Sequence, residues 1–153
     1  MGIRPARPQD VGGIVRLWRE MWDFHTPYDP RFEATPAADV AMASWVEMHL
    51  EQDRSVVLVS QEADGAPDGY LLGMILEKFP GLPAQFYGRV SELAVHRRRA
   101  GIGTRLLEAA HAWFRGRGAP YVEVDVSVKN PVAGAFWRGR GYGPFLERLR
   151  LDL

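Results

Sequence analysis

The stretch that decides the fold is Val90-Ser-Glu-Leu-Ala-Val-His-Arg-Arg-Arg-Ala-Gly-Ile-Gly-Thr-Arg-Leu-Leu107. It begins within an extended apolar run, residues 86–95, which predicts a β-strand, and it ends in an amphipathic helix expected over residues 104–117. The Arg- and Gly-rich turn between them presents unpaired backbone N–H groups and the positive end of the helix. The glycines let an anion approach the backbone closely, and the arginines add charge-assisted hydrogen bonds. This combination predicts a pyrophosphate site in the turn.

Two common nucleotide-binding motifs do not fit this turn. A dinucleotide fingerprint, G-x-G-x-x-G, needs a third glycine where Leu106 stands, and a P-loop needs Gly-Lys followed by Ser or Thr. A tight strand-to-helix connection with solvated arginines is the alternative interpretation. The glycine spacing alone does not decide between that connection and an anion site.

Outward from this stretch, strand and helix patterns follow each other along the chain. Apolar spacing predicts helices over residues 11–22, 37–50 and 131–138, and strands over residues 3–6, 55–60, 70–76, 121–128 and 145–153. Antiparallel strands followed by strand–helix–strand indicate an α/β fold with a mixed sheet. No repeat or linker interrupts the pattern, so we expect a single domain over residues 1–153.

Composition excludes several classes of protein. With 46% hydrophobic residues the chain can form a full core, and the lack of cysteine excludes disulfides, thiol nucleophiles and thiolate metal sites. Four scattered histidines form no zinc pattern, so we expect no metal. No stretch approaches the ~20 apolar residues of a membrane span, and the first ten residues lack the apolar core of a signal peptide. We therefore expect a cytoplasmic protein without a membrane partner.

Charge is unevenly distributed along the chain although the net charge is zero. Residues 20–68 carry eleven acidic and two basic side chains, whereas residues 89–117 carry seven arginines and two glutamates. The balance favours an anionic ligand near the second region and a cationic ligand near the first, although solvated faces produce similar counts. The arginines gather at one helix end rather than along a face, so we expect no nucleic-acid partner.

Two motifs at consistent spacing resemble the GNAT N-acetyltransferase superfamily. The run Arg98-x-x-Gly101-x-Gly103 after Leu93-Ala-Val95 is similar to its acyl-CoA signature. Its later pattern is matched in residue type and spacing by Asn130, Ala133, Phe136-Trp137 and Gly141-Tyr142. The resemblance extends over the order of elements and implies a GNAT-like fold. Such a fold has a mostly antiparallel sheet, a splayed parallel strand pair and helices on both faces.

The resemblance implies acetyl-CoA as co-substrate. The splayed pair, residues 86–95 and 121–128, would form a V-shaped slot in which the pantetheine arm binds like an added strand. Residues 98–104 would cradle the pyrophosphate, and Asn130 would contact the arm from the other side. The full set implied in binding is Leu93, Ala94, Val95, Arg98, Arg99, Ala100, Gly101, Ile102, Gly103, Thr104, Asn130, Ala133 and Trp137.

The activity implied is transfer of an acetyl group from acetyl-CoA to a primary amine by direct attack. A small molecule, a peptide terminus or a lysine could supply the amine, and the backbone N–H of Leu93 would polarise the thioester carbonyl. The amine must lose a proton, which calls for a general base. Glu92 is the nearest carboxylate, and its alternative role is a structural pair with an arginine. Glu123 and Asp125 on the neighbouring strand are the other candidates.

Strict alternation would place Glu92 on one strand face with Val90 and Ala94, opposite Leu93 and Val95. A β-bulge, which is common beside active sites, would change this arrangement.

Acceptor selection and catalysis leave further alternatives open. In the superfamily the first two helices and their loop usually form one wall of the acceptor site, which implies Trp22, His25 and Tyr28 here. Aromatic and acidic residues suit a cationic amine, but Trp22 also fits a core-facing stripe. Family members usually carry a tyrosine where this chain has Trp137, and an indole cannot protonate a leaving thiolate. A non-catalytic acyl-CoA-binding regulatory module is therefore the alternative function. The sequence also leaves open whether the protein forms a homodimer.

Overall fold

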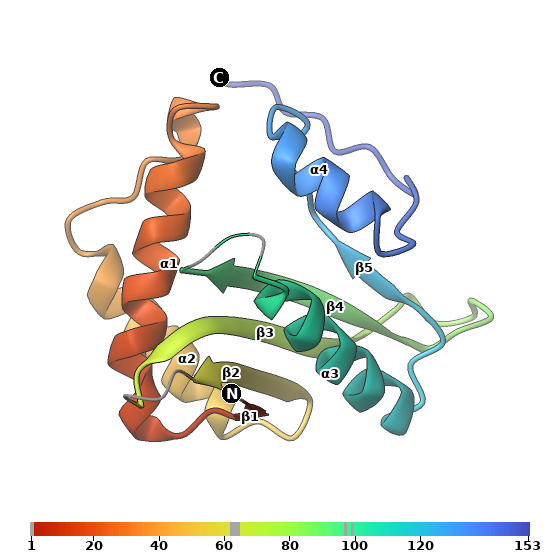
Figure 1. The fold of residues 1–153 in the computed structure, drawn as a ribbon. Coiled ribbons are helices and arrows are strands. Elements are labelled where there is room, and N and C mark those ends of the chain that lie inside the picture. Colours follow the sequence, from red (N-terminus) through yellow and green to blue (C-terminus); the bar gives the residue numbers. More distant parts are fainter. Residues whose placement is uncertain (1, 62–64, 97, 99) are drawn as a thin grey trace.

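A computed structural model describes residues 2–61, 65–96, 98 and 100–153 of the chain (Figure 1). Within these residues, one sheet contains the strands β1 (Ile3–Pro5), β2 (Ser55–Gln61), β3 (Pro67–Glu77), β4 (Phe86–Val95) and β5 (Val122–Val124), in that order. Neighbours from β1 to β4 are antiparallel, whereas β5 pairs with β4 in parallel. The predicted α/β fold with a mixed, mostly antiparallel sheet is confirmed.

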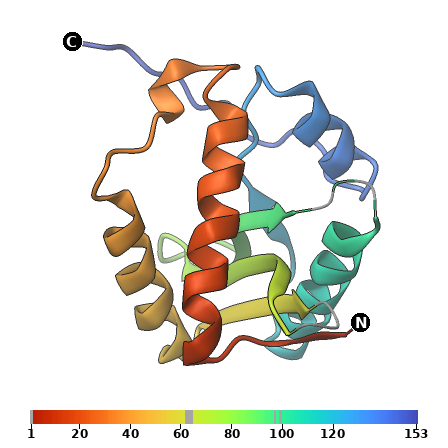
Figure 2. The ribbon, with the colours of Figure 1, turned by 60° about the vertical axis from the view of Figure 1, so that its left-hand side comes forward.

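Helices flank both faces of this sheet, as expected. The described residues form α1 (Val11–His25), α2 (Ala38–Leu50), α3 (Ile102–Gly116) and α4 (Pro131–Arg138), with short 3-10 turns η1 (Pro8–Asp10) and η2 (Pro30–Phe32). Helices α1 and α2 cover one face, α3 covers the other, and α4 follows β5 (Figure 1, Figure 2). The helix predicted over residues 11–22 extends to His25.

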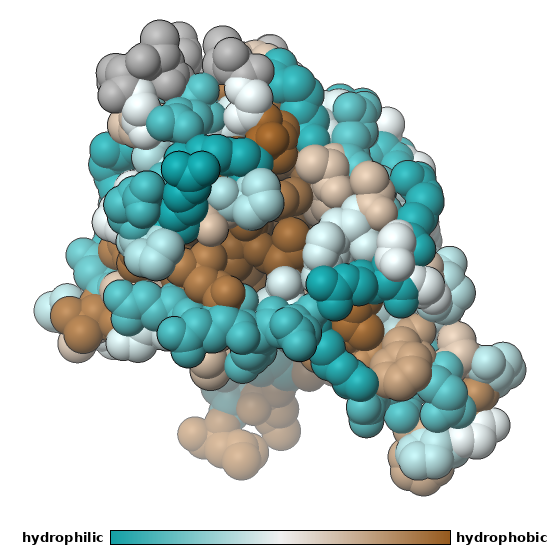
Figure 3. All heavy atoms as spheres, turned by 90° about the horizontal axis from the view of Figure 1, so that it is seen from below, coloured by the Kyte–Doolittle hydropathy of each residue, from teal (hydrophilic) through white to brown (hydrophobic). Residues whose placement is uncertain are grey.

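Each face of the sheet has its own apolar core, because successive residues of a strand point to opposite faces. Tyr70 packs with Ile14 of α1 in one core, whereas its neighbour Leu71 packs with Leu106 of α3 in the other. All four side chains are fully buried. Seen from the side that carries β1, apolar side chains lie in a hollow at the middle of the surface, with mostly polar ones around it (Figure 3).

Gly88 of β4 lets Phe114 of α3 pack directly against the strand. A Cβ atom at residue 88 would lie 2.6 Å from Phe114 Cδ1, and the ring is buried. We expect Gly88→Ala to lower the free energy of unfolding by about 1–3 kcal/mol, because the ring must move within a packed core. Urea unfolding followed by circular dichroism measures the change. Gly116→Ala is the control, since nothing lies within 4 Å of a Cβ there; equal losses in both variants would refute the packing argument.

Two predicted strands differ in the structure. The strand expected over residues 121–128 pairs with β4 only over Val122–Val124, and residues 125–130 leave the sheet toward α4. The strand expected over residues 145–153 is wrong for the single chain: among the described residues, this C-terminal segment pairs with no strand. Alternation of side chains does not suffice for a strand, which also needs a neighbour for its backbone hydrogen bonds.

Candidate active site

Strands β4 and β5 diverge after three paired residues, as expected for the splayed strand pair that the resemblance implies. Their only Cα partners among the described residues are Gly88↔Val122, Arg89↔Glu123 and Val90↔Val124. Beyond Val90, β4 continues along β3 as far as Val95, while the chain after Val124 turns toward α4 (Figure 1). The carboxyl-terminal half of β4 therefore has β3 on one edge only.

The open edge of β4 carries backbone groups of two predicted residues. His96 N–H donates to the Asp68 carbonyl of β3 at 2.8 Å. Because successive N–H groups of an extended strand point to opposite edges, Ala94 directs its N–H toward β3, whereas Leu93 and Val95 direct theirs toward the gap. Of the three strand residues predicted to bind the arm, two thus present backbone donors on the edge of β4 that faces away from β3.

The turn after β4 places residues 100–104 at the N-terminus of α3. Gly101 has a φ of 76°, a left-handed conformation that favours glycine, and Ile102 anchors the helix in the core. The hydroxyl of Thr104 accepts from Arg140 Nη2 at 2.7 Å. The guanidinium of Arg140 thus lies beside the positive N-terminal end of α3. The sequence analysis did not single out this residue. Arg99 lies outside the described residues.

Two contacts join this turn to helix α1. The guanidinium of Arg98 lies 3.4 Å from the ring centroid of Phe24, and His96 Nδ1 lies 2.9 Å from a Glu20 carboxylate oxygen. Both α1 residues belong to the acidic and aromatic first third of the chain. The acidic segment, residues 20–68, and the arginine-rich segment, residues 89–117, are therefore in contact at this point.

A β-bulge in β4 sets the direction of Glu92. Leu72 faces Glu92 across the ladder, but Gly73 faces Val90, so Ser91 has no partner on β3. Val90 consequently packs in the core beneath α3, whereas Ala94 packs in the core beneath α1 and α2. The expectation that Val90 and Glu92 share a face is wrong, and the bulge is the reason.

Glu92 is hydrogen-bonded and largely shielded from water. The hydroxyl of Tyr70, itself fully buried, donates to Glu92 Oε2 at 2.9 Å. Burial raises the pKa of Glu92 to about 7, and the hydrogen bond from Tyr70 opposes part of this rise. A carboxyl with a pKa near neutrality is well matched to accepting a proton from an amine.

The two other candidate bases lie elsewhere. Glu123 and Asp125 line a cleft of about 870 Å³ between β5, α4 and residues 142–148. Asp125 forms ion pairs with Arg89 and, at 2.9 Å, with Arg148. The Asp125 carboxylate is thus already engaged by two guanidinium groups. The geometry therefore favours Glu92.

The aromatic residues predicted for the acceptor wall form two groups. Trp22 and His25 of α1 gather around Phe32, with ring centroids 5.3 Å apart for Trp22–Phe32 and 5.9 Å for His25–Phe32. Tyr28 packs instead on Phe24, at 5.5 Å. The structure thus brings Trp22 and His25 together and places Tyr28 with the ring that contacts the turn.

One hydrogen bond links His25 of α1 to Asn130 at the start of α4. His25 Nδ1 donates to the Met21 carbonyl at 2.8 Å, which leaves Nε2 to accept from Asn130 Nδ2 at 3.2 Å. Asn130 Oδ1 accepts from the Ala133 N–H and so caps α4. Asn130 is 2% exposed, and both ends of its amide have protein partners. Its side chain thus holds α4 against α1.

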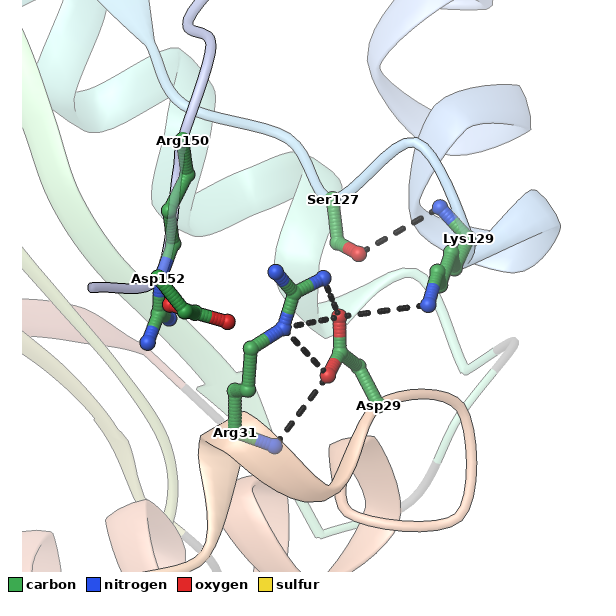
Figure 4. A network of polar contacts seen from close by, with 6 residues as sticks. All are labelled: Asp29, Arg31, Ser127, Lys129, Arg150 and Asp152. Atoms are coloured by element: carbon green, nitrogen blue, oxygen red, sulfur yellow. Dashed lines mark hydrogen bonds and ion pairs between the residues drawn. The ribbon is translucent and has the colours of Figure 1, made fainter.

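A second link between the same loops was not foreseen. Buried Asp29 accepts from Arg31 Nη2 at 2.6 Å and lies 3.6 Å from Lys129 Nζ (Figure 4). The Arg31 guanidinium holds the pKa of Asp29 well below its usual range. The C-terminal residues Arg150 and Asp152 lie on the other side of Arg31 (Figure 4). The sequence analysis did not foresee this link, because Lys129 on the loop before α4 is a hundred residues away from Asp29 in the chain.

Trp137 of α4 is 8% exposed and lines the cleft beside β5. Its indole packs edge-on against Tyr142, with ring centroids 5.0 Å apart. The Tyr142 hydroxyl is hydrogen-bonded to His111 Nε2 at 2.8 Å, and burial raises the pKa of Tyr142 to about 12. Ala133 packs against the same core. Trp137 is therefore a buried side chain that lines the cleft.

The comparisons with known proteins show the family to which the chain belongs. A model of the acetyltransferase (GNAT) family matches residues 15–142, so the chain belongs to the GNAT acetyltransferase family. No curated protein sequence matches the chain significantly.

Solved structures of the same fold include a tetramutant of the BH1408 protein from Bacillus halodurans, with 22% identity, a TM-score of 0.89 and 100% coverage of both chains. Aminoglycoside N-acetyltransferase AAC(6')-Iy in complex with CoA has 18% identity and a TM-score of 0.79, over 99% of this chain and 93% of that chain. AAC(6')-IG from Acinetobacter haemolyticus has 17% identity and a TM-score of 0.78, over 100% and 98%. At these identities the likeness shows the fold alone.

Within the described part of the chain, no helix has both the length and the apolar character that crossing a bilayer requires. Nor do the described residues bring three or more acidic or histidine side chains together as a metal site.

Proposed function

We propose that the protein transfers the acetyl group of acetyl-CoA to a primary amine by direct attack on the thioester. The observation that carries the proposal is Glu92, a carboxyl with a pKa near 7 on the strand that borders the slot. Glu92 receives the proton that the ammonium group loses before the attack. The nitrogen then forms the new C–N bond, the C–S bond breaks, and the second proton of the nitrogen passes to water. The departing thiolate takes its proton from water, which its ordinary pKa of about 8.5 permits.

The described residues suit an acyl-CoA molecule at two places. The N–H groups of Leu93 and Val95 offer a strand edge to the amides of the pantetheine arm, and the Leu93 N–H also polarises the carbonyl. The turn at Gly101 offers the N-terminus of α3 to the pyrophosphate. The chain contains no cysteine that could carry the acetyl group, which supports direct attack.

The acceptor is a cationic amine that enters beside α1. Trp22, His25 and Tyr28 supply aromatic surface there, and Glu20 and Asp23 on the same helix supply negative charge. Two similar structures are aminoglycoside N-acetyltransferases, so an aminoglycoside belongs among the acceptors tested beside a polyamine, a peptide terminus and a lysine peptide.

A second candidate is a non-catalytic acyl-CoA-binding module. Trp137 favours it, because an indole N–H is too weak an acid to protonate a leaving thiolate. Release of free thiol from acetyl-CoA with each acceptor separates the two functions. Acetyl transfer predicts sustained release with at least one cationic amine, and Glu92→Gln slows this release strongly. Tight acetyl-CoA binding without release for every amine class would overturn the enzyme proposal.

Tyr70→Phe tests the hydrogen bond to Glu92. That bond stabilises the charged carboxylate, so its loss raises the pKa of Glu92 above 7. We expect the acidic limb of the kcat/KM profile to move to higher pH, while the high-pH plateau changes little. A full pH profile measures this shift. Tyr87→Phe, on the amino-terminal half of β4, is the control with an unmoved profile. A uniform loss at all pH values in Tyr70→Phe would contradict the assignment.

Trp137→Phe tests whether the indole acts as a wall. Phenylalanine keeps most of the apolar surface and has no N–H, so we expect most of kcat to remain. Steady-state kinetics together with acetyl-CoA binding check this result. A loss of about 100-fold or more in kcat, with binding intact, would show instead that the indole N–H contributes to the chemical step.

A further inference from the structure

The end of helix α4 packs against the first turn of α3 (Figure 2). The ring of Phe136 lies on this turn, since a Cβ atom at Gly103 would be 3.5 Å from two of its carbon atoms. Residues four apart share one face of a helix. Arg140, two residues beyond the end of α4, therefore continues the face that carries Phe136. This packing brings an arginine to the turn at which we propose that the pyrophosphate binds.

Arg140 is held in place from one side of its guanidinium group. Its Nε and Nη2 atoms donate to Thr104 Oγ1 at 3.1 and 2.7 Å, and the guanidinium carbon lies 5.5 Å from the centroid of the Phe136 ring. Nη1 donates to the Gly139 carbonyl at 3.4 Å. A guanidinium group has five N–H donors, so two stay available.

The charge of Arg140 is not compensated within the described part of the chain. Other arginines, such as Arg4, Arg19 and Arg54, each form an ion pair with a carboxylate. No carboxylate partner of Arg140 occurs among the described residues, and the neighbouring end of α3 is itself positive. Two positive groups side by side favour an anionic ligand.

The hydroxyl of Thr104 also has a proton to donate. A hydroxyl group has two acceptor lone pairs and one donor. Arg140 donates to this oxygen twice, so both lone pairs are occupied. No acceptor for the hydroxyl proton occurs among the residues that the structure describes. A phosphate oxygen suits this place, because it accepts hydrogen bonds from a guanidinium and from a hydroxyl group.

Acetyl-CoA has phosphate groups at two places, the pyrophosphate and the 3′-phosphate of the ribose. The N–H groups at the start of a helix point along its axis, where the pyrophosphate would lie, whereas side chains project from the flank of the helix. Thr104 and Arg140 offer their donors on this flank. Arg140 is also exposed, which suits the outer end of the ligand. A phosphate monoester carries a charge of about −1.5 to −2 at neutral pH, so it is a strong partner for a guanidinium group.

We propose that Arg140, oriented by Thr104, binds the 3′-phosphate of acetyl-CoA and makes the protein select this ligand over acetyl-dephospho-CoA. The inference rests on the proposed function, because it adds a contact to the same co-substrate. The pantetheine and pyrophosphate contacts are common to both ligands. The selection therefore depends on the one group by which the ligands differ.

Calorimetric titration of the full chain with acetyl-CoA and with acetyl-dephospho-CoA tests the proposal. We expect the parent to bind acetyl-CoA at least about 10-fold more tightly, as hydrogen bonds to a charged group predict. Arg140→Gln should lower the affinity for acetyl-CoA to that for acetyl-dephospho-CoA. Its affinity for acetyl-dephospho-CoA should equal that of the parent, which also shows that the variant is folded.

Two further variants make the test specific. Thr104→Val keeps the shape of the side chain without the hydroxyl, so the preference for acetyl-CoA should become smaller. Arg117→Gln is the matched control, because it removes the same charge at the other end of α3, where the guanidinium of Arg117 also lies over a ring, that of Trp113. Both of its affinities should equal those of the parent.

Several results would overturn the assignment of Arg140 and leave the proposed function intact. These are equal affinities of the parent for the two ligands, a loss in Arg140→Gln that is the same for both, an unchanged preference in Thr104→Val, and a loss of preference in Arg117→Gln. A parent chain that binds neither ligand would instead overturn the proposed function, and this inference with it.

Discussion

Glu92→Gln is expected to lower kcat by about 100- to 10,000-fold, the range for loss of a general base, while acetyl-CoA affinity stays unchanged. Glutamine keeps the shape of the side chain and can still accept from Tyr70, but it cannot take a proton from the amine. Steady-state kinetics with saturating acetyl-CoA and a cationic amine, together with calorimetry of acetyl-CoA binding, measure the two effects separately.

The pH dependence makes this test sharper. Because the pKa of Glu92 is about 7, activity of the parent enzyme should fall below pH 7 and level off above it. In Glu92→Gln the fall in activity around pH 7 should disappear. The loss of kcat relative to the parent should become smaller as the pH approaches the pKa of the acceptor amine, about 10 for a lysine. Glu123→Gln should behave like the parent, since Glu123 lines the cleft between β5 and α4. Equal losses in both variants would contradict the choice of Glu92.

Much of the fold was predictable because its signals are local. Residues close in sequence determine the apolar face of α3, the turn at Gly101 and the alternating apolar runs of the strands. The exception is the C-terminal segment, whose alternation is typical of a strand. Strand formation also requires a neighbouring strand, and the alternation of side chains does not show whether one is present.

The candidate site was predictable to the extent that motifs fix its residues. The turn after β4 and the placement of Glu92 on β4 follow from position in the chain. The direction of Glu92 does not, because it depends on a single bulged residue, Ser91, and its pKa depends on burial beside Tyr70. The link from His25 to Asn130 joins residues 105 positions apart, so no local pattern could show it.

Gly101→Val is expected to abolish acetyl-CoA binding at the concentrations that saturate the parent. The residue has a φ of 76°, which β-branched side chains rarely adopt, so the turn must rearrange and its N–H groups move off the pyrophosphate. Hydrogen bonds to charged groups contribute about 1.5–3 kcal/mol each. Losing two of them weakens binding by at least about 100-fold. Calorimetric titration with acetyl-CoA measures the loss.

Gly118→Val separates binding from backbone strain. Gly118 has nearly the same φ, 77°, but lies after the far end of α3, with nothing within 4 Å of a Cβ. Both variants should lose about 1–3 kcal/mol of stability through strain, whereas only Gly101→Val should lose acetyl-CoA binding. Thermal unfolding and calorimetry on the two variants test this pairing. Unchanged affinity in Gly101→Val would remove the turn from the site, and a parallel loss of affinity in Gly118→Val would mean that general destabilisation explains the effect.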